Sequence, residues 1–228
     1  MRGLFITGTD TGVGKTYVSA QVVRCLSGQG RRVAACKPVA TGAMPQDGLL
    51  VSEDTRILSE AAGIEIERVT GWVFAEPVAP PVAARRHGVS LRLEEIVGFV
   101  RKVSEEAEFS VVEGIGGLLC PLTETATVAD FARELGFPVV IVARRSLGTL
   151  NHTLLTLEAA SGRNLGVAGI VVNETEPCRS LADETNVDEL RRRIKVPILA
   201  VVPHAQGNGN HVAESIETVN WLELGAGV

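Results

Sequence analysis

GTDTGVGKT, residues 8–16, follows a short apolar run and precedes a segment with helical spacing. Backbone N–H groups of a glycine-rich turn that leads into a helix point at phosphate oxygens, and the helix N-terminus adds positive potential. In such a loop Lys15 reaches the β- and γ-phosphates, and the Thr16 hydroxyl ligates Mg²⁺. One residue more than usual separates Gly8 from Gly14, but the amide geometry tolerates it. We therefore expect a phosphate-binding loop, or P-loop, that takes ATP with Mg²⁺.

Short apolar runs bounded by turn residues recur along the rest of the chain. Runs without clean alternation are typical of strands buried on both faces. They cover residues 4–6, 32–36, 109–112, 139–142, 167–172 and 198–202. Between them, segments after residues 15, 93 and 149 have apolar residues at helical spacing. This alternation predicts an α/β fold: a single P-loop domain over residues 1–228, with a mostly parallel sheet and helices on both faces.

Loops are predicted where glycine, proline and asparagine gather. The three segments are residues 38–52, 75–81 and 206–210. Neither of the first two is long enough to separate two domains.

Composition excludes several classes of function. The chain has 228 residues, is 45% hydrophobic and 21% charged, and carries a net charge of −5, so there is no global basic field for nucleic acid or anionic lipid. No apolar stretch approaches the roughly 18 residues that a membrane span needs, and the first run is too short for a signal peptide. The four cysteines are widely spaced without a zinc pattern, as in free thiols of a reducing compartment. We expect a cytoplasmic protein that contacts neither nucleic acid nor membrane.

Ligands of open parallel sheets bind beyond the carboxyl ends of the strands, so the residues that follow each run are the site candidates. Lys37 ends the second run and is placed to hold an anion near the P-loop, where the Thr41 hydroxyl could join it. Glu113 ends the third run, the Walker B position, where a carboxylate holds Mg²⁺. Asp54 stands at a helix start and, taken alone, reads as a capping residue.

Two further strand ends leave alternatives open. Asn173 could read a nucleobase edge with its amide, or it could be an ordinary turn residue. A helix begins near Thr149, and its free N–H groups could bind a carboxylate attracted by Arg144 and Arg145. The other interpretation is a surface basic pair beside a capped helix. His152 is expected to be structural.

Several motifs occur together in an order and spacing that resemble the dethiobiotin synthetase family. The likeness runs from residue 3 to about 203 and rests on GTDT at 8–11, VGKT at 13–16, KPV at 37–39, FAEP at 74–77, VEG at 112–114, LG at 147–148, NH at 151–152 and Asn173. The first motif is distinctive of that family, and the combination is highly specific.

The resemblance implies ATP-dependent closure of a cyclic urea. The substrates would be 7,8-diaminopelargonic acid and CO₂, and the reaction would pass through a carbamate and a carbamic-phosphoric anhydride to dethiobiotin, ADP and phosphate. It also implies a homodimer whose active site lies at the subunit interface, with the substrate carboxylate at the helix start of the second subunit.

The resemblance also implies roles for individual residues. The catalytic residues would be Lys15, Lys37 and Thr11. Magnesium would be held by Thr16, Asp54 and Glu113. The substrate would contact Thr11, Lys37, Thr41, Gly148, Thr149, Leu150 and Asn151. The nucleotide would contact Asp10, Gly12, Val13, Gly14, Lys15, Thr16, Tyr17, Glu113, Asn173 and Pro203.

The sequence departs from its relatives at two of these positions. Gly12 stands where they often carry an acidic side chain, so that contact is absent, and Thr41 keeps the hydroxyl of a serine. Two alternatives share the fold. A switch ATPase of the partition or septum-positioning type would need a lysine near the start of the P-loop, where residues 8–11 have none. Another ligase, of the cobyrinic acid amidase-coupled kind, would carry a glutamine-hydrolysing domain for which this chain has no room.

Overall fold

The computed structural model describes residues 1–46, 48–178, 180–204 and 212–226, and its centre is a six-stranded sheet in the order β10-β9-β8-β1-β7-β2. All neighbouring strands of this sheet pair in parallel. The strands are β1 (Gly3–Gly8), β2 (Val33–Cys36), β7 (Phe109–Gly117), β8 (Val139–Arg144), β9 (Val167–Asn173) and β10 (Ile198–Val202). Each corresponds to a predicted run, so the α/β class is confirmed.

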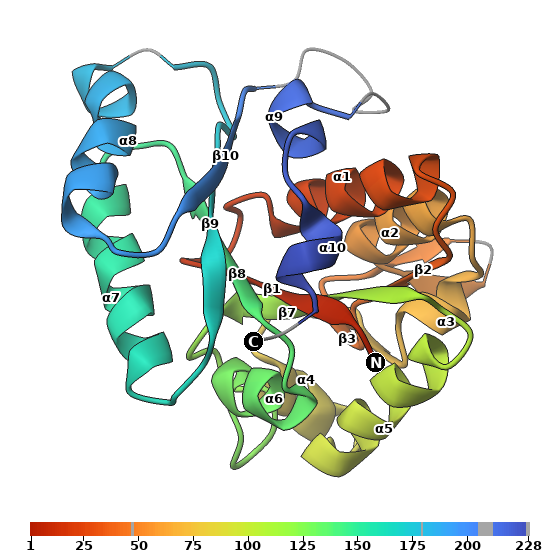
Figure 1. Ribbon diagram of the computed structural model, residues 1–228. Coiled ribbons are helices and arrows are strands. Elements are labelled where there is room, and N and C mark those ends of the chain that lie inside the picture. Colours follow the sequence, from red (N-terminus) through yellow and green to blue (C-terminus); the bar gives the residue numbers. More distant parts are fainter. Residues whose placement is uncertain (47, 179, 205–211, 227–228) are drawn as a thin grey trace.

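Helices cover both faces of the sheet, as Figure 1 shows. Successive residues of a strand point to opposite faces, and in β1 Leu4 and Ile6 enter one core while Phe5 enters the other. Helices that pack on the Leu4 side are α1 (Lys15–Gly28), α2 (Glu53–Ala62), α3 (Ile66–Val69), α9 (Glu214–Glu217) and α10 (Trp221–Leu224). Helices that pack on the Phe5 side are α4 (Pro80–Arg86), α5 (Leu93–Ser104), α6 (Val128–Leu135), α7 (Thr149–Ser161) and α8 (Leu181–Arg193). The predicted helices after residues 15, 93 and 149 are therefore confirmed.

The prediction of a loop over residues 38–52 was wrong. The segment holds three short strands, β3 (Val39–Thr41), β4 (Met44–Gln46) and β5 (Leu49–Val51). β4 and β5 form an antiparallel hairpin, while β3 pairs in parallel with the later strand β6 (Trp72–Phe74). The partner of β3 is distant in sequence, so local glycine and proline content could not reveal the pairing.

The other two predicted loops have different outcomes. Within residues 75–81, Pro80 and Pro81 open α4, where proline is tolerated because the first helical N–H groups have no partner in the helix. Residues 206–210 lie outside the described residues. Across the parts of the chain that are described, no helix combines the length and apolarity needed to cross a membrane.

The strand order places a switch point beside β1. From β1 the chain crosses to β2 at the sheet edge, returns to β7 on one side of β1, and then continues to β8 on the other side. Ligands of open sheets bind where the order reverses in this way. The P-loop follows β1 directly, so it lies at this reversal, together with the end of β7.

Candidate nucleotide and substrate site

The P-loop leaves its amides free for a phosphate. Helix α1 begins at Lys15, and its N-cap is Gly14, with φ 88° and no side-chain cap. Gly12 also has a positive φ, 72°. Both conformations suit glycine, and the uncapped first-turn N–H groups are free to bind an anion. The Lys15 ammonium folds back over the loop and donates to the Asp10 carbonyl at 3.0 Å.

Lys37 joins the carboxylates that the sequence pointed to separately. Its Nζ lies 2.8 Å from Glu113 Oε1 and forms a second ion pair with Asp54 Oδ2. The Thr16 hydroxyl donates to the same Glu113 oxygen at 2.8 Å. Lys37 and Glu113 are only 4% and 1% exposed. Because charges this deeply buried are tolerated only when paired, the cluster is a single electrostatic unit.

Burial and charge act in opposite directions on these groups. Burial alone would lower the pKa of Lys37, but the charges of Glu113 and Asp54 outweigh it and raise that pKa. Burial would raise the pKa of Asp54, but the charge and hydrogen bond of Lys37 lower it below its usual value. For Lys15 burial dominates, so its pKa is lowered. Near neutral pH, Lys37 is therefore an ammonium and Asp54 a carboxylate.

The cluster fits a magnesium ion. Glu113 Oε2 is buried and has no hydrogen-bond partner among the described residues. Magnesium is commonly held by one or two carboxylates together with hydroxyl, water and phosphate oxygens. Thr16, Asp54 and Glu113 supply one hydroxyl and two carboxylates around Lys37. Glu113 Oε2, which has no hydrogen-bond partner, is therefore available to ligate the ion.

Thr16, Lys37 and Asp54 of this cluster open on a cavity of about 510 Å³. It is lined by Thr11, Gly12, Gly14, Lys15, Thr16, Lys37, Thr41, Asp54, residues 77–80, Ile115, Gly116 and Cys120. The structure thus brings together the residues predicted for phosphate, metal and carbamate. No role was predicted for Ile115, Cys120 or residues 77–80. The FAEP motif at 74–77 was the one signal for that last segment.

Glu76 holds the segment of residues 77–80 that lines one side of this cavity. Its carboxylate contacts His87 Nε2 at 2.8 Å and accepts from Arg86 Nε at 3.2 Å, both at the end of α4. The hydrogen bond with His87, aided by those from backbone and Arg86, lowers the pKa of Glu76 to about 2. Its backbone carbonyl accepts from Gly42 N–H at 3.1 Å. Glu76 therefore ties the lining residue Pro77 to the loop that follows Thr41.

Other predicted residues lie around the cavity rather than in it. Asn173 is buried at the end of β9, and its Nδ2 donates to the Val13 carbonyl at 3.0 Å. Tyr17 packs partly buried against the core, while Pro203 is exposed after β10. Their nucleotide contacts stay predictions.

The start of α7 faces a different part of the P-loop. Thr149 and His152 line a separate hollow of about 90 Å³ together with Thr9, Asp10 and Arg144. Among the described residues, none of 148–151 lines the cavity of about 510 Å³ beside Lys37. Carboxylate binding by residues 148–151 thus also stays a prediction.

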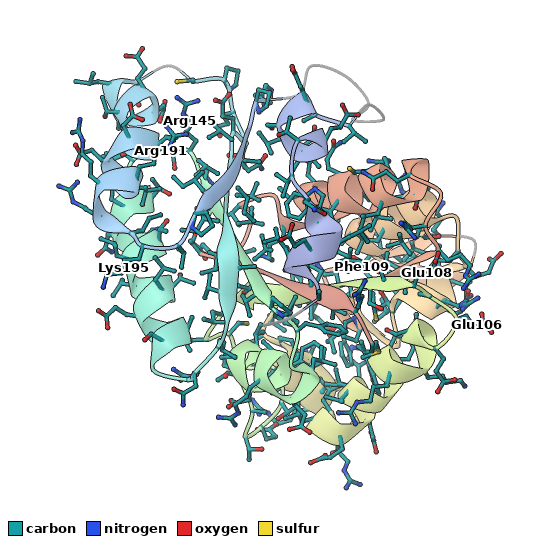
Figure 2. All side chains as sticks on the ribbon, viewed as in Figure 1. Glu106, Glu108, Phe109, Arg145, Arg191 and Lys195 are labelled. Carbon is teal, nitrogen blue, oxygen red and sulfur yellow. The ribbon has the colours of Figure 1, made fainter. Side chains whose placement is uncertain are left out.

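The adjacent arginines have separate partners. Arg145 donates to the Asp183 carbonyl at 2.6 Å and pairs with Glu174, which places it against α8 (Figure 2). Arg144 turns to the P-loop and donates to the carbonyls of Thr11 and Gly12. The pair is therefore no simple surface basic patch.

Comparison with known proteins identifies the family. A family model described as an AAA domain matches residues 2–211. The ATP-dependent dethiobiotin synthetase BioD of Aromatoleum aromaticum is 39% identical over 208 residues, which cover 90% of this chain and 92% of that protein. The chain belongs to the dethiobiotin synthetase family. The predicted resemblance is confirmed, and the family is one of ligases.

Solved structures show the same fold at low identity. The ParA family ATPase from Chlorobium tepidum TLS superposes with a TM-score of 0.57 and 14% identity, over 97% of this chain and 91% of that one. Cobyrinic acid a,c-diamide synthase from Mycobacterium smegmatis, with bound ADP and magnesium, has a TM-score of 0.52 and 14% identity, over 94% and 91%. Both alternative functions considered from the sequence, the switch ATPase and the other ligase, occur on this fold, so the fold alone does not distinguish them from a synthetase. The 39% identical relative favours the synthetase family.

Proposed function

We propose that this synthetase family member carboxylates 7,8-diaminopelargonic acid with CO₂ and closes the cyclic urea of dethiobiotin at the expense of ATP. The observation that carries the proposal is the buried Lys37 ammonium, held between Asp54 and Glu113 in the cavity that Lys15 and Thr16 also line. Phosphoryl transfer relies mainly on positioning and charge neutralisation, and this cluster supplies both.

The reaction needs three bond-forming steps. One substrate amine attacks CO₂ and loses a proton to give a carbamate. A carbamate oxygen then attacks the γ-phosphorus, ADP leaves, and a carbamic-phosphoric anhydride remains. Finally the second amine attacks the carbonyl carbon, phosphate leaves, and the five-membered urea closes with loss of a proton.

The residues of the cavity suit these steps. Lys15 and Lys37 hold the negative charge of the γ-phosphate and the carbamate, and the hydroxyls of Thr11 and Thr41 orient the carbamate end. Thr16, Asp54 and Glu113 would hold magnesium, which would supply neutralisation of the phosphate charge. In this proposal the amides of residues 12–16 bind the β- and γ-phosphates, and Asn173 and Pro203 contact the nucleobase.

A second copy of the chain completes the site in this proposal. Residues 148–151 do not line the cavity of about 510 Å³ in their own described chain, which supports a substrate carboxylate that reaches them from the reaction centre of a second subunit. Leu147, just before α7, is 85% exposed and Leu155, within α7, is 59% exposed, which suits burial against another subunit. Leu155→Asp should give a monomer in sedimentation and raise the KM for the diamine. A Leu155→Asp dimer of wild-type stability would remove this support.

The activity is tested by incubating the protein with Mg-ATP, bicarbonate and the diamine while dethiobiotin and ADP are followed by mass spectrometry. Dethiobiotin should form only with all three present and should be lost in Lys37→Met. The matched control is Lys102→Met, which removes an exposed lysine from α5. ATP hydrolysis without dethiobiotin would refute the substrate and leave the P-loop assignment standing.

A further inference from the structure

Four successive carbonyls of the P-loop are held by side-chain donors. The Asp10 carbonyl accepts from Lys15 Nζ at 3.0 Å, and the Val13 carbonyl accepts from Asn173 Nδ2 at 3.0 Å. Between them, Arg144 Nη2 donates to Gly12 O at 3.1 Å and to Thr11 O at 3.4 Å. Each backbone carbonyl from residue 10 to residue 13 therefore accepts a side-chain hydrogen bond, and we call this set of hydrogen bonds the grip on the loop.

This grip decides where the amides point. In a planar trans peptide the C=O and the following N–H point in opposite directions. When Arg144 holds the carbonyls of Thr11 and Gly12, the N–H groups of Gly12 and Val13 are turned away from the guanidinium. Gly12 and Gly14 line the cavity, so a phosphate there meets amides that are already oriented.

Two of the side chains that hold these carbonyls come from the central sheet. Arg144 and Asn173 end the adjacent strands β8 and β9 and are direct partners in the parallel register. A side chain at position 12 would crowd this arrangement, because a Cβ built on Gly12 lies 3.3 Å from Arg144 Nη2. The lack of a side chain at Gly12 thus leaves room for the guanidinium of Arg144.

We propose that Arg144 is a positioning residue for phosphate binding, which acts on the nucleotide through the backbone of the P-loop. It orients the amides of Gly12 and Val13 rather than touching the ligand. Arg145, although adjacent, is engaged by Glu174 and the Asp183 carbonyl and has no part in this role. The inference rests on the proposed function only in that the loop binds phosphate.

The test measures binding without the diamine, so it stands even if no dethiobiotin is formed. Dissociation constants of Mg-ADP and of inorganic tripolyphosphate are determined by calorimetry for the wild type, Arg144→Met and Arg144→Lys. The matched control is Arg101→Met, which removes an exposed arginine from α5. Arg144→Met should weaken both ligands about tenfold, as expected for the loss of charge-assisted hydrogen bonds. The control should stay within about twofold of the wild type.

Arg144→Lys distinguishes the hydrogen bonds of the guanidinium from the effect of positive charge alone. A lysine keeps the positive charge but lacks the planar guanidinium, so it should recover only part of the affinity. If Arg144→Met does not fold, the affinity of Arg144→Lys tests the proposal in its place. In turnover, the KM for ATP should rise while the KM for the diamine stays unchanged.

Four outcomes would overturn the inference. They are wild-type affinity for both ligands in Arg144→Met, a loss of affinity confined to ADP, full recovery in Arg144→Lys, and a rise in the KM of the diamine alone. The second would mean a contact with the nucleoside, the third an effect of charge alone, and the fourth a contact with the substrate carboxylate.

Discussion

Replacing Lys37 by methionine should destabilise the protein as well as inactivate it. The change removes an ammonium that pairs with Glu113 and Asp54 and leaves both carboxylates without their cation. Breaking a buried ion pair by removing one partner costs about 3–5 kcal/mol. The side chain of Asp54 is 42% exposed and that of Glu113 is fully buried, so Glu113 carries most of the cost. We therefore expect the lower end, about 3 kcal/mol.

Thermal unfolding followed by circular dichroism measures this loss. For a chain of this size 1 kcal/mol corresponds to about 2–4 °C, so Lys37→Met should melt about 6–12 °C below the wild type. Lys102→Met, on the exposed face of α5, should stay within about 2 °C. Added Mg²⁺ should restore part of the loss in Lys37→Met, because Glu113 and Asp54 then bind the cation in place of the ammonium.

The pH dependence follows from the shifted pKa values. The pKa of Lys37 is raised, so its contribution is fully present below the ordinary value of 10.5 and is lost only as the pH rises through the folded value. The pKa of Asp54 is lowered, so its part is present above 3.8 and disappears as the pH falls below that. The melting difference should therefore be constant from about pH 6 to 9 and shrink in acid.

A double variant distinguishes an unpaired charge from poor packing. Lys37→Met with Glu113→Gln removes both charges of the buried pair and should be more stable than Lys37→Met alone. If Lys37→Met melts within about 2 °C of the wild type, or the double variant is no more stable than the single one, the electrostatic reasoning is wrong.

Three further predictions concern the walls of the site. Gly14→Ala should abolish ADP binding in calorimetry, because at φ 88° its Cβ would lie 2.1 Å from Asn173 Nδ2. Gly28→Ala is the neutral control, since a Cβ there has no atom within 4 Å. Retained ADP binding in Gly14→Ala would contradict this packing. Iodoacetamide should label exposed Cys178 first, while buried Cys25 and Cys36 stay unlabelled in peptide mass spectra. Bound diamine should slow the labelling of Cys120, which lines the cavity, and an equal rate with and without ligand would contradict that position. Glu76→Gln should lower the melting temperature above pH 4.5, and the difference should vanish as the pH falls through about 2; a pH-independent difference would exclude the carboxylate as its source.

The sequence could predict the core of the fold because its signals are local. Unbroken apolar runs indicate buried parallel strands, and the glycines and lysine of residues 8–16 specify a phosphate loop wherever they follow a strand. Lys37 and Glu113 could be chosen from strand ends alone, since all carboxyl ends of a parallel sheet meet at one edge. The pairing of β3 with β6 could not be predicted, because it depends on a distant partner and not on the composition of residues 38–52.

Directions of side chains were decided by the tertiary structure. Asp54 reads as a helix cap in the sequence, but the packing of α2 beside β2 turns it to Lys37. Arg144 and Arg145 are equivalent in the sequence, yet alternation along the strand end sends one to the P-loop and the other to Glu174. The sequence by itself determined the type of fold and the chemistry of the loop. Strand register and helix packing decided which polar atoms meet, because such contacts join residues far apart in the chain.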